Sequence, residues 1–386
     1  MINELKSDFN KIYNKVGERA FFSPGRVNLI GEHTDYNGGN VFPCALDMGT
    51  FAIVSKREDE LVRAYSNNFK ELGVIEFSLE NLINIKEDDW GNYPKGVIKM
   101  FVDEGHKIDN GFDILFHGNI PNGSGLSSSA SIELATAIVL KNLFSLDVDM
   151  VSMVKLAQKA ENKFIGVNCG IMDQFAIGMG KANCAILLDT KNIIHKYVPL
   201  DLKDSVIVIA NTNKRRGLAD SKYNERRYEC DTALGELKEV VKINELCDLC
   251  AEDFEKHSGV IKNDVNRRRA KHAIYENERT KKAVVELEKG DLKAFGKLMN
   301  ASHVSLRDDY EVTGIELDTL VELAWMEEGV IGSRMTGAGF GGCTVSIVNE
   351  KNVESFMKNV GAGYKDAIGY DATFYIGRVG DGTREI

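Results

Sequence analysis

Two glycine-rich segments hold most of the residues that could do chemistry. Residues 118–131 read Gly-Asn-Ile-Pro-Asn-Gly-Ser-Gly-Leu-Ser-Ser-Ser-Ala-Ser and precede apolar residues at helical spacing. Glycine lets the backbone approach a ligand, and the free N–H groups that begin a helix attract anions. The segment has neither a Walker A Gly-Lys-[Ser/Thr] nor a third GxGxxG glycine, because Ser128 stands there. We therefore predict a phosphate loop, with serine capping of an ordinary helix as the alternative.

The second segment, residues 24–39, mixes charged side chains with glycines. Arg26, Glu32, His33 and Asp35 lie within ten positions of one another. Carboxylates accept hydrogen bonds from hydroxyl groups, so Glu32 and Asp35 suit a polyol or a sugar. Taken alone, the segment could also be a solvated polar loop. A metal cluster is disfavoured because the spacing matches no common zinc site.

Two further acids stand in apolar surroundings. Glu161 lies on the apolar stripe of a helix expected over 150–165, where an unpaired carboxylate is costly. Either a metal ion or a buried salt bridge would compensate it. Asp173 follows in Asn-Cys-Gly-Ile-Met-Asp-Gln, a context that isolates a carboxylate from bulk water and makes it a candidate base.

A third glycine run, residues 335–343, satisfies GxGxxG with Gly337, Gly339 and Gly342. A strand pattern follows it, whereas a dinucleotide site requires a helix there. We therefore expect a tight loop pressed against a ligand or another loop.

Apolar periodicity predicts the elements that must position these segments. The mixture of helices and strands indicates an α+β fold, and the length favours two domains, 1–198 and 199–386. Residues 51–54 and 61–65 are expected to pair as a hairpin, and residues 216–300 to be helical and charged. Other helices are expected at 3–16, 92–105, 128–144, 150–165 and 315–328, and other strands at 112–116, 206–210, 343–348 and 372–378.

Composition excludes several classes of function. The chain has 386 residues, 48 Lys+Arg against 58 Asp+Glu, and a net charge of −10, which argues against a nucleic-acid binder. No stretch approaches the ~20 apolar residues of a membrane span, so no membrane partner is expected. Seven scattered cysteines make a poor disulfide framework and favour a reducing compartment, the cytoplasm.

Taken together, the motifs resemble those of galactokinases in the GHMP superfamily of small-molecule kinases. The matching segments are 24–36, 123–130 and 335–342, with further matches at 170–174 and 223–227. The resemblance implies a two-lobed GHMP kinase fold with mixed and antiparallel sheets and an active site between the lobes. It implies ATP-dependent phosphorylation of the C1 hydroxyl of D-galactose, with Mg²⁺ as cofactor, and we expect a monomer.

The resemblance also implies residue roles. Asp173 would accept the proton of the C1 hydroxyl or only orient it, and Arg26 would stabilise charge on the transferring phosphoryl group. Ser129 and Glu161 would bind magnesium. The sugar would contact Glu32, His33, Thr34, Asp35, Gly170 and Tyr223, and the nucleotide would contact Ser66, Gly123, Ser124, Gly125, Leu126, Ser127, Ser128 and Ser129.

Two alternatives share the scaffold. One is a kinase for a related sugar such as N-acetylgalactosamine, which needs room beside C2 of the sugar. The other is a galactose sensor without catalysis, which the intact serine loop over 125–131 disfavours.

Overall fold

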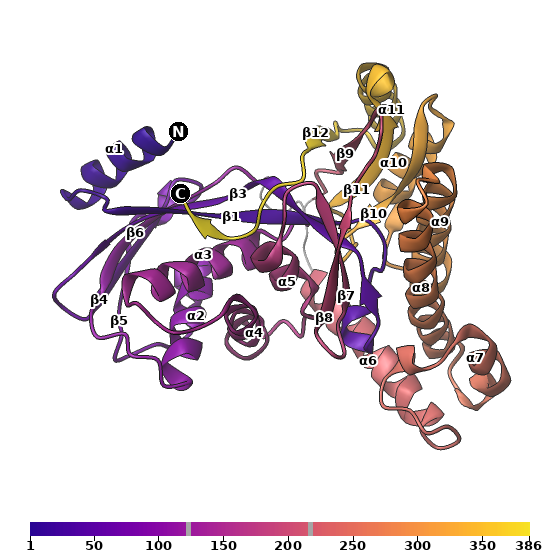
Figure 1. Ribbon diagram of the computed structural model, residues 1–386, viewed down its shortest axis with the longest axis horizontal. Helices are drawn as coiled ribbons and strands as arrows, with labels where there is room; N and C mark the ends of the chain where they lie inside the picture. Colours follow the sequence, from indigo (N-terminus) through magenta and orange to yellow (C-terminus); the bar gives the residue numbers. More distant parts are fainter. Residues whose placement is uncertain (121–124, 215–218) are drawn as a thin grey trace.

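The computed structural model describes residues 1–120, 125–214 and 219–386, which form two lobes (Figure 1). Its helices are α1 (Ile2–Tyr13), α2 (Asn92–Asp103), α3 (Ser128–Leu143), α4 (Met150–Ala160), α5 (Met172–Met179), α6 (Ala219–Leu237), α7 (Ala251–His257), α8 (Asp264–Glu288), α9 (Leu292–Ser305), α10 (Gly314–Met326) and α11 (Val353–Ile368). Its strands are β1 (Arg19–Asn28), β2 (Asn40–Val41), β3 (Pro43–Lys56), β4 (Leu61–Ser66), β5 (Ile75–Ser78), β6 (Phe112–Gly118), β7 (Cys184–Asp189), β8 (Ile194–Pro199), β9 (Ser205–Asn211), β10 (Val330–Thr336), β11 (Cys343–Asn349), β12 (Thr373–Gly377) and β13 (Arg384–Glu385).

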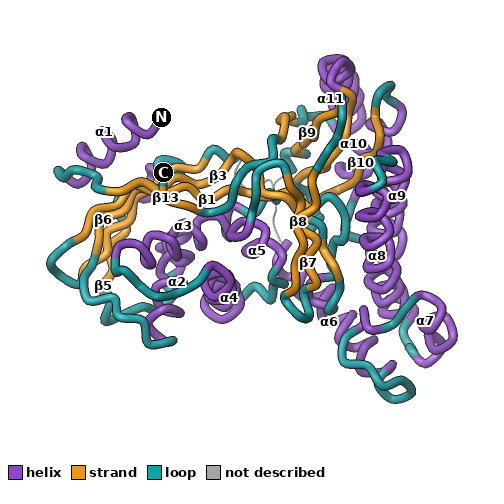
Figure 2. The backbone as a smooth tube through the Cα atoms, viewed as in Figure 1, coloured by secondary structure: helices purple, strands orange, loops and turns teal. Residues whose placement is uncertain are grey.

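The N-terminal lobe is a six-stranded sheet with helices on both faces (Figure 2). The strand order is β13-β1-β3-β6-β4-β5, and all pairs are antiparallel except β4 with β6. Successive side chains of a strand point to opposite faces, and β3 shows the consequence. Ile53 packs against α1, whereas Ala52 and Val54 belong to the larger core that includes side chains of α2, α3, α4 and α5.

The C-terminal lobe is a four-stranded antiparallel sheet in the order β10-β11-β9-β12. Alternation along β9 again creates two apolar faces. Ile207 and Ile209 pack with apolar residues of α8 and α9, and Val208 and Ala210 pack with those of α10 and α11.

Two features join the lobes. A small sheet, β2-β7-β8, lies between them, and the end of the chain returns so that β13 pairs with β1 (Figure 1). The boundary near residue 198 falls between β8 and β9 and stays a prediction. No helix in the described ranges is both long and apolar enough to cross a membrane.

Most of the predicted helices and strands are confirmed within a few residues, although β3 begins at Pro43 rather than near residue 51, and the hairpin of residues 51–54 with 61–65 is wrong. Strand β6 lies between β3 and β4 and pairs with both. The buried carboxylate of Asp113 on β6 holds this arrangement by accepting hydrogen bonds from Arg57 (3.0 Å) and Arg63 (2.6 Å). Alternation predicts a strand and its buried face, but it does not identify the neighbouring strand.

The helix expected over 150–165 also differs in detail. Its α-helical part, α4, ends at Ala160, and a π-helical turn follows over Glu161–Ile165. Such turns frequently occur at functional sites because they change the direction of a side chain relative to the helix. Glu161 is the first residue of this turn and points into the cavity described next.

Candidate active site

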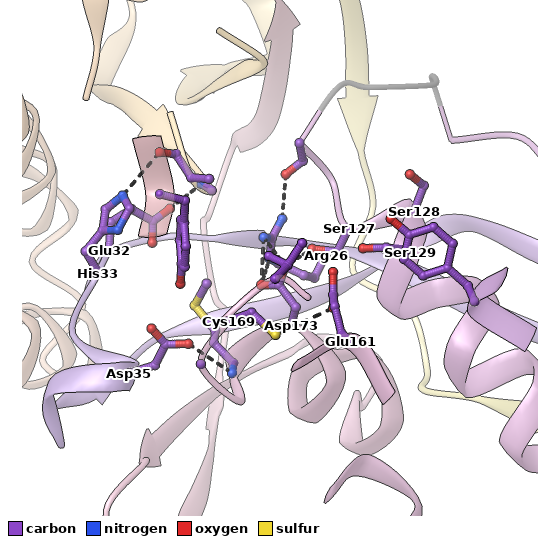
Figure 3. Close-up of a pocket in the computed structure, with 18 residues that line it drawn as sticks. Arg26, Glu32, His33, Asp35, Ser127, Ser128, Ser129, Glu161, Cys169 and Asp173 are labelled. Carbon is purple, nitrogen blue, oxygen red and sulfur yellow. Dashed lines mark hydrogen bonds and ion pairs between the residues drawn. The ribbon is translucent and has the colours of Figure 1, made fainter. Parts of the chain in front are cut away.

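A cavity of about 250 Å³ lies between the lobes and gathers residues from six separate segments (Figure 3). In this view Arg26 and Asp173 occupy the centre, the side chains of Glu32, His33 and Asp35 lie on one side, and Ser128 and Ser129 lie on the other. The lining residues are Arg26, Glu32, His33, Asp35, Tyr93, Gly125, Ser127, Ser128, Ser129, Glu161, Val167, Cys169, Gly170, Met172, Asp173, Tyr223, Gly337 and Ala338.

The centre of the cavity is an arginine–aspartate pair. Arg26 on β1 donates from Nε to Oδ1 of Asp173 (2.8 Å) and from Nη2 to Oδ2 (2.7 Å), which is the bidentate arrangement that suits a guanidinium and a carboxylate. Its Nη1 donates to the carbonyl oxygen of Gly125 (2.7 Å). The Asp173 side chain, at the start of α5, is 31% exposed against 4% for Arg26, so a substrate can reach the carboxylate.

Glu32 is held by groups from both lobes. Its side chain accepts hydrogen bonds from Nδ2 of Asn28 and from the backbone N–H of Gly337 (2.5 Å), and its Oε1 lies 3.6 Å from Nη1 of Arg334. Burial raises the pKa of Glu32 to about 7, although the nearby guanidinium groups of Arg334 and Arg26 act in the opposite direction. Glu32 therefore changes charge near neutral pH.

His33 lines the cavity, but both of its ring nitrogens are engaged by the protein. Nε2 lies 3.2 Å from the carbonyl oxygen of Ala338, which can only accept, so Nε2 carries the proton. Nδ1 then accepts from the hydroxyl of Tyr36 (2.8 Å), which in turn lies 2.6 Å from the hydroxyl of Tyr310. Burial lowers the pKa of His33 to about 3, so the ring is neutral. The imidazole ring of His33 therefore presents a flat, neutral surface to the cavity.

Asp35 lies beside the loop that precedes α5. Its Oδ2 accepts from the backbone N–H of Met172 (3.2 Å), and burial raises the pKa of Asp35 to about 6, to which the charge of Asp173 also contributes. A Cβ on Gly170 would lie 1.9 Å from Oδ2 of Asp35, so only glycine fits at position 170. Tyr223 on α6 faces the same part of the cavity, and its ring lies 5.6 Å from that of His33.

Thr34 lies outside the cavity lining. Its hydroxyl donates towards the backbone carbonyls of Gly31 (2.9 Å) and Asn40 (2.8 Å), and the residue is fully buried. The geometry therefore gives Thr34 a role in the shape of the loop that presents its two neighbours.

The opposite end of the cavity is the start of α3. Gly123 and Ser124 lie outside the described residues. Arg26 N–H donates to the carbonyl of Leu126 (3.1 Å), whose side chain is part of the core, and the hydroxyl of Ser127 donates to Asp173. Ser127, the residue before α3, makes no side-chain capping hydrogen bond, so the cap of the alternative interpretation is not formed by this residue.

A second cavity, of about 190 Å³, adjoins the first at this end. The two share Tyr93, Ser128 and Ser129, and Ser66 lines the second one together with apolar residues such as Trp90 and Ile132. A mostly apolar cavity that meets a helix N-terminus suits a flat base attached to a phosphate chain.

The side chains beside Ser129 fit a divalent cation. Glu161 is almost completely buried, and burial raises its pKa, with the charge of Asp173 acting in the same direction, whereas a hydrogen bond with Ser129 lowers it. A carboxylate and a hydroxyl are hard oxygen ligands of the kind that Mg²⁺ prefers, and both side chains line the cavity. No cation from the described part of the protein forms an ion pair with Glu161 in this arrangement, so the metal interpretation fits better than a buried salt bridge.

The third glycine run is a loop between β10 and β11, as predicted. Gly337, Gly339, Gly341 and Gly342 all have positive φ values. A Cβ on Gly337 would lie 2.9 Å from the carbonyl oxygen of Gly125, so the loop packs closely against the start of the phosphate loop. The same loop includes Gly337, whose backbone N–H donates a hydrogen bond to Glu32.

Sequence reasoning missed several residues that shape the site. Arg334 and Glu276, both fully buried in the C-terminal lobe, fix the loop of Glu32: Arg334 donates to the carbonyl of Asn28 (3.0 Å), and Glu276 accepts from the N–H of Gly31 (2.9 Å). Neither lies in a recognisable pattern. Tyr93 was missed as well, although an aromatic residue at the start of a predicted helix is a weak signal.

The fold and this site define a small-molecule kinase of the GHMP superfamily. Family models match as the GHMP kinase N-terminal domain over residues 92–181, the GHMP kinase C-terminal domain over 283–366, and the galactokinase galactose-binding signature over 7–56. The predicted fold class is thereby confirmed.

Comparison with individual proteins narrows the class. The chain is 64% identical to a galactokinase of Clostridium beijerinckii, covering 100% of this chain and 99% of that one, and 62% identical to a galactokinase of Clostridium acetobutylicum with the same coverage. It is similar to the crystal structure of Lactococcus lactis galactokinase complexed with galactose, with a TM-score of 0.98, 49% identity and full coverage of both chains. The chain belongs to the galactokinase family, and it is a kinase enzyme.

Proposed function

We propose that this chain transfers the γ-phosphoryl group of ATP to the C1 hydroxyl of galactose in the cavity between its lobes. The observation that carries the proposal is the position of the Arg26–Asp173 pair, which separates buried carboxylates suited to a sugar from a helix N-terminus suited to phosphate. A reacting hydroxyl and a phosphoryl group would meet at that pair.

In this proposal the sugar is held by oxygen atoms that still have free lone pairs. Glu32 and Asp35 accept from galactose hydroxyls, and Tyr223 closes the same end of the cavity. His33 contributes a neutral surface, because its two nitrogens are already engaged, and Gly170 contributes space beside Asp35. Thr34 supports the loop.

Asp173 orients the C1 hydroxyl and takes up its proton as the phosphoryl group leaves ATP. Arg26 holds Asp173 with two hydrogen bonds and places positive charge where the oxygens of the transferring group develop negative charge. Phosphoryl transfer depends mainly on positioning and on such electrostatic stabilisation. Both groups are preorganised, since Arg26 is also fixed by the carbonyl of Gly125.

Glu161 and Ser129 would hold Mg²⁺, which would offset the negative charge of the phosphate groups of ATP. The first N–H groups of α3 add positive potential at the same place. Residues 125–129 would follow the phosphates, and Ser66 would lie near the base in the adjoining cavity.

A coupled assay of ADP release over a panel of sugars tests the proposal. We expect ATP consumption that depends on galactose and is much slower with N-acetylgalactosamine, glucose or arabinose. A preference for N-acetylgalactosamine would replace galactose as the substrate, and galactose binding without turnover would indicate a sensor. The cytoplasmic location and the monomeric state stay predictions from composition and resemblance.

A further inference from the structure

A buried row of three polar side chains lies behind the phosphate end of the cavity. Nε2 of Gln174 donates to Oε2 of Glu161 (2.7 Å) and to Oε2 of Glu133 (3.0 Å). Glu133 and Gln174 are completely buried and do not line the cavity. Neither residue can therefore contact a substrate, although the row ends on the proposed metal ligand.

The contacts fix the orientation of the Gln174 amide. A primary amide has two N–H hydrogens, and here each one points to a different carboxyl group. The flipped amide would direct its oxygen at both carboxyl groups and could accept only from a protonated one, whereas the present orientation donates to both. The amide therefore holds Oε2 of Glu161 and leaves the other carboxylate oxygen directed towards the cavity.

The row also connects the two helices that carry the chemistry. Gln174 follows Asp173 at the start of α5, and Glu133 lies four residues after Ser129 on α3, which is the same helical face. Each carboxyl group accepts from the same amide, so a shift of either helix changes the position of Glu161.

This arrangement is not explained by stability. Oε1 of Glu133 and Oε1 of Gln174 are buried and have no hydrogen-bond partner among the described residues. Unpaired buried acceptors are costly, and leucine and methionine would fill a similar volume without that cost. A polar row kept in the core next to a functional carboxylate indicates a positioning function.

We infer that Glu133 and Gln174 form a buried clamp that orients the Glu161 carboxylate towards a divalent cation. The inference rests on the metal role proposed for Glu161 and adds two positioning residues to it. Partners of a metal ligand commonly change metal affinity about 10- to 100-fold when they are removed.

The test measures metal affinity by calorimetric titration of ADP at a series of Mg²⁺ concentrations, so that turnover is not required. For Gln174→Leu and Glu133→Leu we expect the Mg²⁺ concentration at half-maximal effect to rise about 10-fold or more. Metal-free ADP affinity and galactose affinity should stay within twofold of the wild type. Glu133→Gln is the matched control, because its amide oxygen can still accept from Gln174, and we expect its Mg²⁺ dependence to be close to that of the wild type.

Glu161→Ala separates the metal role of Glu161 from the effect of the clamp. If this variant keeps the wild-type Mg²⁺ dependence, the metal role of Glu161 fails and the clamp fails with it. If it shifts the dependence and both leucine variants do not, the clamp alone is overturned. Should the leucine variants unfold below the assay temperature, the isosteric variants Gln174→Glu and Glu133→Gln replace them. A shift of the Mg²⁺ dependence in Gln174→Glu but not in Glu133→Gln supports the clamp. The same Mg²⁺ dependence in both variants overturns it.

Discussion

The two ends of the active-site cavity are built differently. The phosphate end is largely local, because one loop and the first turn of α3 supply most of its groups. The sugar end is assembled from distant segments: Glu32 accepts from Gly337, some 300 residues away, and lies beside the buried Arg334 of the other lobe. If the proposed function is right, phosphate binding follows from the backbone geometry of one loop and helix, whereas sugar recognition depends on how the lobes meet. The Arg26–Asp173 pair joins the two ends.

The largest effect is expected where the two ends meet. Asp173→Asn keeps the size of the side chain but removes the carboxylate that, in the proposed function, orients the C1 hydroxyl and takes up its proton. We expect kcat to fall by about 10³-fold, within the range found for general acid–base groups, while ADP affinity stays nearly unchanged. Single-turnover kinetics and calorimetry measure the two quantities. Turnover at the wild-type level would remove Asp173 from the mechanism.

Arg26→Ala tests the other partner of that pair. We expect kcat to fall by a factor of about 10² or more, which corresponds to roughly 2.7 kcal/mol of lost transition-state stabilisation. Arg26→Lys is the control, because it keeps the charge but loses the two-pronged contact with Asp173, and it should recover only part of the rate. An effect confined to KM would mean that Arg26 contributes binding rather than catalysis.

Glu32→Gln sharpens the comparison at the sugar end. The amide loses one acceptor oxygen for a sugar hydroxyl, so we expect the KM for galactose to rise about 10- to 100-fold with a small change in kcat, in line with the energy of hydrogen bonds to charged groups. The KM for ATP should be unaffected, because Glu32 does not touch the phosphate end. Equal changes in both KM values would contradict the separation of the two ends.

Galactose use at the sugar end of the cavity should depend on pH. The pKa of Glu32 is raised to about 7 and that of Asp35 to about 6, and the ionised carboxylates are the forms that accept from hydroxyl groups. As pH falls through this window both groups take up protons, so kcat/KM for galactose should fall about 20-fold between pH 8 and pH 6. The Glu32→Gln variant should lose most of this dependence. An unchanged profile in the variant would assign the titration to another group.

Thr34→Val is expected to give the smallest effect. The substitution keeps the volume but removes the hydroxyl that donates to the backbone carbonyls of Gly31 and Asn40. We expect the free energy of unfolding to fall by about 1 kcal/mol with little change in the KM for galactose. Thermal unfolding and steady-state kinetics check the two quantities, and a large rise in KM would restore Thr34 to the sugar contacts.

Much of the fold could be predicted because apolar periodicity reports which face of an element is buried. The strand over β6 and the helices α2 and α3 followed from that signal alone. The pairing of β3 and β4 did not, because the buried ion pairs of Asp113 that place β6 between them join residues about 50 positions apart. The apolar pattern did not predict the π-helical turn at Glu161 either, because a single extra residue per turn leaves that pattern almost unchanged.

The amino-acid sequence by itself determined the chemistry of this site: which carboxylates, glycines and serines are present, and that a helix begins at the proposed phosphate site. Those properties depend on residue type and short-range spacing. The tertiary structure alone decided how the residues are used. It engaged both nitrogens of His33, turned Thr34 away from the cavity, and placed Arg334 and Glu276 behind the sugar loop. The physical reason is that hydrogen bonding and burial are set by groups from other elements, which no local pattern in the chain records.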